Sequence, residues 1–76
     1  MPFQGRADKT IDKMRRGGLP APTKHTGLVG RGDRRPCDGC SETIHPSETQ
    51  WVVTLQQTFQ WRFHEECYDA WVSFHH

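Results

Sequence analysis

The chain has 76 residues, of which 33% are hydrophobic, and a formal net charge of +1. This length allows one small domain without a large apolar core, and no apolar run approaches the ~20 residues that a membrane-spanning helix needs. The N-terminal region has no signal-like apolar segment, so we expect a reducing, cytoplasmic location and no membrane partner. In that compartment clustered cysteines bind metal more often than they form disulfides.

Charge and aromatic residues divide the chain near Cys37. Residues 1–36 carry nine basic residues against three acidic ones, whereas residues 37–76 carry one against six. Phe3 is the one aromatic residue before Cys40, and seven follow it. We therefore predict a basic arm over residues 1–36 and a folded, acidic module over residues 37–76. The basic residues of the arm are Arg6, Lys9, Lys13, Arg15, Arg16, Lys24, Arg31, Arg34 and Arg35.

The arm is predicted to contain a short helix over about residues 8–16. Asp8 is a suitable N-cap, and the basic residues of the last turn suit the helix dipole. We expect Gly18 to adopt the left-handed conformation that ends many helices, with Leu19 folding back on Met14. Such a short helix is marginal in isolation, so it must dock on another part of the protein or fray.

Residues 19–36 are rich in proline and glycine and are predicted to form an extended, irregular linker. Leu28 and Val29 form an apolar pair within this linker, and we expect them to pack against the module. Its glycines do not match a phosphate-binding loop, because no Gly-Lys-Ser/Thr ending follows them. His25, in this linker, and His45, in a later turn, are expected to face solvent.

All three cysteines belong to one spaced motif, C-x2-C followed after 23 residues by H-x2-C. Three cysteines and one histidine are a usual ligand set for structural zinc. Residues three apart share one face of a helix, so His64 and Cys67 can ligate together from a first helical turn. The motif therefore predicts one structural Zn²⁺ held by Cys37, Cys40, His64 and Cys67, with no coordination position left open for catalysis.

Other interpretations of the cysteines remain open. Small buried or free cysteines beside an unrelated histidine would also fit. A redox-active C-x2-C normally lies beside a βαβ pattern, which the sequence lacks. A secreted disulfide scaffold favours an even number of cysteines, and this chain has three.

The rest of the module predicts a hairpin. Ile44 follows the first ligand pair and is expected in the core, and residues 45–48 form a turn. Residues 50–55 are rich in β-branched and aromatic side chains, which favours a strand. Alternating aromatic residues over 59–63 give a second strand, and residues 56–58 turn the chain between the two.

A helix over residues 64–74 is predicted to cover the aromatic face of this hairpin. Cys67, Ala70, Trp71 and Phe74 lie at i, i+3, i+4 and i+7, which places them on one side of the helix. We interpret this stripe as core rather than as a ligand-binding surface. The predicted fold class is thus a small α+β domain stabilised by zinc.

A C-x2-C turn, a hairpin and a ligand-bearing helix follow one another in the order that is typical of a treble-clef zinc finger, which this chain resembles. The ligand spacing is also similar to that of the first zinc-binding half of a LIM domain, which implies a role in protein interaction. Residues 11–74 resemble small, uncharacterised bacterial zinc-finger proteins, a resemblance that implies the zinc site and the fold but no activity. The residues that carry it are Leu19-Pro20, Gly30 and Gly32, Cys37 and Cys40, Ile44 to Glu48, and His64, Cys67 and Trp71.

Three classes of function follow from these patterns. The first is a non-enzymatic interaction module with a protein partner, with regulation as one role open to it, since no nucleophile–base set and no HNH-type pattern accompanies the ligands. The second is nucleic-acid binding through the nine basic residues of the arm. In a third, oxidation of the cysteines releases the metal, as in a redox or metal sensor. The arm can equally be a solvated tail or pack on the acidic module of its own chain.

Overall fold

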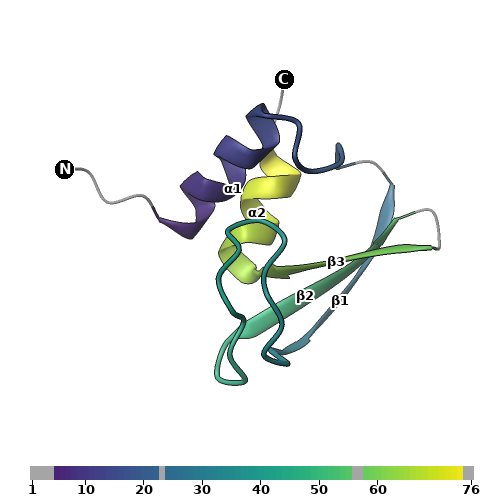
Figure 1. Cartoon of the computed structure of the whole chain (residues 1–76). Helices are drawn as coiled ribbons and strands as arrows, with labels where there is room; N and C mark the ends of the chain where they lie inside the picture. The colour runs from purple at the N-terminus through teal and green to yellow at the C-terminus, as the bar shows by residue number, and fades with distance from the viewer. Residues whose placement is uncertain (1–4, 23, 56–57, 75–76) are drawn as a thin grey trace.

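The computed structural model describes residues 5–22, 24–55 and 58–74 of the chain. Two helices lie together on one side of a three-stranded antiparallel sheet with the order β1-β2-β3 (Figure 1). Helix α2 packs on strands β2 and β3, and helix α1 packs on α2. The predicted small α+β class is therefore confirmed. The elements are α1 (Arg6–Arg15), β1 (His25–Arg31), β2 (Thr49–Leu55), β3 (Phe59–His64) and α2 (Glu65–Ser73).

Helix α1 begins at Arg6, two residues before the predicted start. Its N-cap is Gly5, which provides no side-chain hydrogen bond, so Asp8 is not the cap but an acidic residue within the first turn. The carboxylate there still favours the positive end of the helix dipole. The buried Thr10 donates its hydroxyl to the carbonyl of Arg6 at 3.0 Å, which satisfies a polar group that packing removes from water.

The end of α1 is a Schellman motif centred one residue earlier than predicted. Gly17, not Gly18, takes the left-handed conformation, with φ at 75°. The N–H of Gly18 donates to the carbonyl of Lys13 at 2.9 Å, and that of Gly17 to the carbonyl of Met14 at 3.1 Å. These two bonds define the motif. Met14 and Leu19 are both buried in the core, as the sequence indicated.

Part of the expected irregular linker is a strand. Strand β1 pairs antiparallel with β2 along its whole length, from His25 opposite Leu55 to Arg31 opposite Thr49. The prediction of an irregular linker over residues 19–36 is therefore wrong for residues 25–31. The strand lacks a buried apolar face, and its glycines have low β propensity, so the signal that usually marks a strand is missing. Pairing with the edge of β2 determines its conformation.

Three side chains of the arm differ from the expectations. Leu28 and Val29 are 68% and 61% exposed, so they do not pack against the module. His25 is half-buried rather than solvent-facing: its Nε2 lies 3.0 Å from the Tyr68 hydroxyl, and its ring contacts Trp71 with centroids 5.0 Å apart. β1 thus attaches to α2 through His25 and to β2 through its backbone.

The core lies between α2, the hairpin and the segment before β2. Ile44, Val53, Phe63 and Trp71 are fully buried, which confirms Ile44 and, within the helix stripe, Trp71 as core residues. Cys67 of the stripe is also buried, whereas Ala70 and Phe74 are half-buried. Trp71 stacks on Phe63 with centroids 5.3 Å apart, and its indole N–H donates to the carbonyl of Pro20 at 2.8 Å. The segment that follows α1 is therefore held by the last turns of α2.

The hairpin of β2 and β3 agrees with the sequence pattern. Each strand is one residue longer than predicted, since β2 begins at Thr49 and β3 includes His64. Helix α2 ends at Ser73, one residue short of the predicted end. Residues 56 and 57 of the predicted turn, and the histidines at positions 75 and 76, lie outside the described residues.

The chain makes a close approach where β1 ends. Gly32 is buried, its N–H donates to the carbonyl of Glu48 at 3.0 Å, and an added Cβ would meet Ile44 Cγ2 at 2.7 Å and the carbonyl of His45. Gly32→Ala should therefore destabilise the metal-loaded protein by about 1–3 kcal/mol, because the backbone must shift. Urea unfolding measures the change. Gly30→Ala is the matched control, since nothing lies within 4 Å of its added Cβ, and equal losses in both variants would contradict the prediction.

Candidate metal centre

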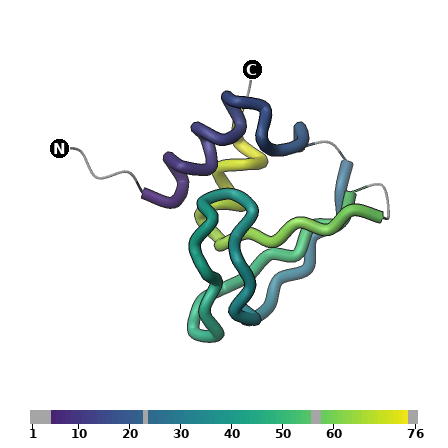
Figure 2. The backbone as a smooth tube through the Cα atoms, in the orientation of Figure 1, coloured from purple at the N-terminus to yellow at the C-terminus, as the bar shows by residue number. Residues whose placement is uncertain are grey.

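The first ligand pair lies on a narrow loop between β1 and β2. Pro36 and Thr43 form a bridge across the base of this loop, and Cys37 and Glu42 are linked by a 2.8 Å bond from N–H to carbonyl. The N–H of Ser41 donates to the carbonyl of Cys37 at 2.9 Å. This closed turn, the knuckle (residues 37–42), belongs to the teal arch that lies next to the start of α2 in Figure 2. It brings the Cys37 and Cys40 side chains to one side of the loop.

The second pair comes from the junction of β3 and α2. His64 is the last residue of β3 and the N-cap of α2, and Cys67 lies in the first turn of that helix. The predicted i, i+3 spacing therefore places both side chains on the helix face that looks toward the knuckle. Glu65 and Glu66 lie between them and are exposed.

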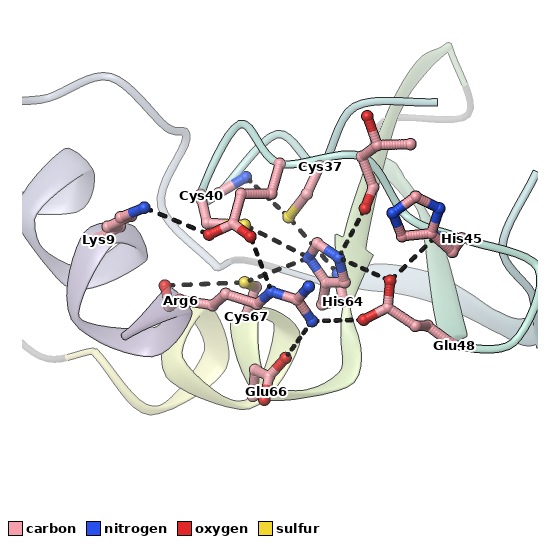
Figure 3. A network of polar contacts seen from close by, with 12 residues as sticks. Arg6, Lys9, Cys37, Cys40, His45, Glu48, His64, Glu66 and Cys67 are labelled. Carbon is pink, nitrogen blue, oxygen red and sulfur yellow. Dashed lines mark hydrogen bonds and ion pairs between the residues drawn. The ribbon is translucent and has the colours of Figure 1, made fainter. Parts of the chain in front are cut away.

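The structure brings all four predicted ligands together (Figure 3). One ligand atom from each of Cys37, Cys40, His64 and Cys67 lies within 4.8 Å of the others, and all four residues are buried. His64 Nδ1 is 3.3 Å from Cys40 Sγ and 3.9 Å from Cys67 Sγ. A tetrahedron with zinc–sulfur bonds of about 2.3 Å and a zinc–nitrogen bond of about 2.0 Å has edges of roughly 3.5–3.8 Å. The cluster can therefore hold one metal ion with little adjustment.

The hydrogen bonds of His64 determine which nitrogen faces the sulfurs. Nε2 lies 3.3 Å from the carbonyl oxygen of Thr43. A carbonyl only accepts, so Nε2 carries the hydrogen and Nδ1 presents its lone pair to the three cysteines. A ligating histidine usually donates its other N–H in this way, so the ring is oriented for coordination through Nδ1.

The three sulfurs differ in how readily they lose a proton. Cys37 accepts a hydrogen bond from the thiol of Cys67 and backbone bonds from Gly39 and His64 at 3.3 and 3.5 Å, which lower its pKa to about 4. Donation to Cys37, together with burial, raises the pKa of Cys67. Burial also raises the pKa of Cys40. The site thus favours one thiolate, and a divalent ion must displace the other two protons.

A network of charged residues surrounds this cluster and ties α1 to it (Figure 3). The Arg6 guanidinium pairs with Glu48, with Glu66 at 3.1 Å and with Glu42 at 3.4 Å. The bond to Glu48, followed by that to Glu66, raises the pKa of Arg6 above its usual value. Glu48 in turn lies 3.7 Å from Nε2 of His64. Arg6 and Glu48 therefore form a second layer around the ligand histidine.

Arg6, Glu42 and Glu48 surround the site, although no sequence motif marks them as part of it. The opposite net charges of the arm and the module were the one available signal of contact between them. Net charge does not specify which residues form ion pairs. Lys9 also contacts Glu42, at 3.2 Å. The possibility that the arm packs on the acidic module of its own chain is therefore realised for Arg6 and Lys9.

Truncating Glu48 should weaken metal binding. The backbone N–H of His45 and the guanidinium of Arg6 hold the carboxylate and lower its pKa. Glu48→Ala therefore removes one of the carboxylates that hold Arg6 and loosens the surroundings of His64. Loss of an outer-layer partner typically costs 10- to 100-fold in metal affinity, and we expect about tenfold. Competition with a chromophoric chelator measures it. The control is Glu65→Ala, which removes an exposed carboxylate next to His64 at the start of α2 and should leave the metal affinity unchanged. Equal metal affinities in the two variants would contradict the role of Glu48.

Comparisons with protein-family models, with curated proteins and with solved structures find no match to this chain. The functional assignment therefore depends on the geometry and chemistry of the cluster itself. The geometry and chemistry of the cluster support a metal-binding structural module whose candidate ligands are three cysteines and one histidine. Among the described residues, no helix is long and apolar enough to cross a membrane.

Proposed function

We propose that the four-residue cluster holds one structural Zn²⁺ and that the chain is a non-enzymatic interaction module for a protein partner. The observation that carries the proposal is the closure of the site. Each ligand residue is at most 6% exposed, and four protein ligands complete the tetrahedron that zinc prefers in structural sites. A substrate or an activated water would need a fifth or vacated position.

The donor set favours zinc among the common divalent ions. Thiolate and imidazole ligands suit Zn²⁺, whereas Mg²⁺ and Ca²⁺ prefer oxygen ligands. Four protein ligand atoms within 4.8 Å of one another suit the four-coordinate geometry that structural zinc sites almost always adopt. Zinc also explains why such a short chain can bury Cys37, Cys40 and Cys67 without pairing them, since the metal supplies the cross-link.

The arrangement supports a treble-clef-like assignment for the module. The knuckle precedes the hairpin of β2 and β3, and the ligands His64 and Cys67 lie at the start of α2. A structural zinc in this position joins the loop to the helix. The metal would then stabilise the surfaces that a partner recognises without taking part in recognition.

The test combines a binding assay with an activity assay. The zinc-loaded chain and its Cys67→Ser variant are cross-linked in the cells that produce the protein, and cross-linked proteins are identified by mass spectrometry. We expect a defined set of partners that is lost in the variant. Zinc-dependent turnover of any substrate by the purified chain would overturn the non-enzymatic assignment.

A second candidate is nucleic-acid binding by the arm. Several of its basic residues have no carboxylate partner among the described residues, namely Lys13, Arg15, Lys24, Arg31 and Arg34. Phosphate contacts by about five cations would make the logarithm of the affinity for duplex DNA fall with the logarithm of the salt concentration, with a slope of about −4.5. Titrations at several salt concentrations measure this slope, and no binding at low salt removes the candidate.

A further inference from the structure

Over residues 26–31, the outer edge of β1 has no partner strand among the described residues. β1 is the end strand of the sheet, and none of the described residues pairs with the edge that faces away from β2. Residues 26–31 are all exposed. Such an edge presents a row of unpaired N–H and C=O groups that can pair with another extended chain.

The opposite edge of the sheet, on β3, is partly hydrogen-bonded to another part of the chain. Along β3, the backbone of Arg62 is engaged by the knuckle: its N–H donates to Asp38 Oδ2 at 2.7 Å, and its carbonyl accepts from the N–H of Asp38 at 2.7 Å. The side chain and backbone of Asp38 therefore take the place of a further strand there. β1 has no such cover from the described residues, so it is the edge suited to strand addition.

The side chains of β1 also fit an apolar partner. Leu28 and Val29 are consecutive, so they project to opposite faces of the sheet; Leu28 pairs with Val52, and Val29 with Trp51. Both are more than half exposed. Residues 25–31 contain no proline and no lysine, which proteins commonly use to protect an exposed edge. A strand laid beside β1 would cover apolar surface on both faces.

The charges at the ends of β1 indicate what kind of strand fits. Lys24 precedes the strand and Arg31 ends it, and both are exposed without an ion pair among the described residues. Acidic residues at both ends of a partner segment would complement them. In a symmetric antiparallel pairing with a second copy, Lys24 of each copy would approach Arg31 of the other. Like charges across strands are destabilising, so the charges disfavour self-association.

We propose that the outer edge of β1 binds an extended segment of a partner protein, apolar at its centre and acidic at its ends, by adding it to the sheet as a fourth strand. This inference rests on the proposed function and names the surface and the partner chemistry. Main-chain bonds along β1 would supply affinity, as in other cases of strand addition. Leu28, Val29 and the two terminal cations would supply selectivity.

A synthetic peptide tests the proposal on the full, zinc-loaded chain. The probe is acetyl-Glu-Glu-Val-Thr-Val-Thr-Val-Glu-Glu-amide, and amide NMR shifts report both its affinity and its location. We expect shifts and slowed amide exchange concentrated in residues 25–31. A peptide with proline at the central valine should bind at least about tenfold more weakly, because it loses a donor and the extended pairing. Replacing its glutamates with lysines should have a similar effect.

Matched charge reversals separate the edge from net charge. Arg31→Glu lies on β1, and Arg15→Glu lies on the exposed side of α1, so both change the net charge equally. We expect Arg31→Glu to weaken peptide binding by about fivefold and Arg15→Glu to leave it unchanged. Thermal unfolding of both variants verifies that they remain folded.

Several outcomes would overturn the proposal. These are no binding by the peptide, equal losses in the two charge reversals, shifts located away from β1, or a dimer that buries β1. None of these outcomes would contradict the proposed zinc-stabilised interaction module, because metal content and cross-linked partners are measured separately. If partners are captured but β1 variants keep them, the interaction function stands and another surface carries it.

Discussion

Removing the metal should unfold this protein. The four ligands join the knuckle to the start of α2 and are all buried, so without a metal the centre of the chain holds three crowded sulfurs and an imidazole. Binding of structural zinc contributes about 10–16 kcal/mol in small zinc domains, which matches or exceeds the 5–15 kcal/mol stability of ordinary domains. We expect one zinc per chain in a native mass spectrum and loss of the folded circular dichroism signal after chelation.

Single substitutions provide the control for this result. Cys67→Ser removes one ligand at a fully buried position and should abolish stoichiometric zinc binding. Ser47→Ala changes an exposed residue of the turn before β2 and should bind zinc as the unmodified chain does. A chain that contains no metal, or that keeps its folded signal after chelation, would refute the structural role of the site. Cys37 and Cys40 would then need to be reconsidered as a redox pair.

Trp71→Ala should have the largest effect among substitutions away from the ligands. Trp71 is fully buried, stacks on Phe63 and donates its indole N–H to the carbonyl of Pro20. Its removal leaves a cavity between α2 and the hairpin and frees the segment that follows α1. Large aromatic truncations in cores cost about 3–5 kcal/mol. Urea unfolding of the zinc-loaded variant measures the loss.

An exposed aromatic residue provides the comparison. Phe59 is 58% exposed at the start of β3, and Phe59→Ala should change stability by no more than about 0.5 kcal/mol. Trp71→Phe retains most of the ring but removes the N–H, so it should lie between the two. Similar losses in Trp71→Ala and Phe59→Ala would show that the core is not centred on Trp71.

Local patterns in the sequence predicted several elements of the arm and of the module. The alternation over residues 59–63 predicted β3, the apolar stripe ending at Phe74 predicted α2, and glycine after the last turn predicted the end of α1 to within one residue. These signals work because side-chain periodicity reflects the geometry of a single element. β1 had no such signal, since residues 26–31 remain exposed and the strand forms only because β2 offers an edge to pair with.

By itself the sequence determined the candidate ligand set, because two pairs spaced by two residues can present four soft donors only in a few local geometries. The tertiary structure decided how that set is enclosed. Arg6 reaches Glu48 and Glu66, which are 42 and 60 positions away, and a charge pattern cannot specify such pairs because exposed charges are individually weak and interchangeable. The open edge of β1 was likewise decided in three dimensions, where Asp38 bonds to the backbone of β3 at Arg62 and no described residue pairs with the outer edge of β1 over residues 26–31.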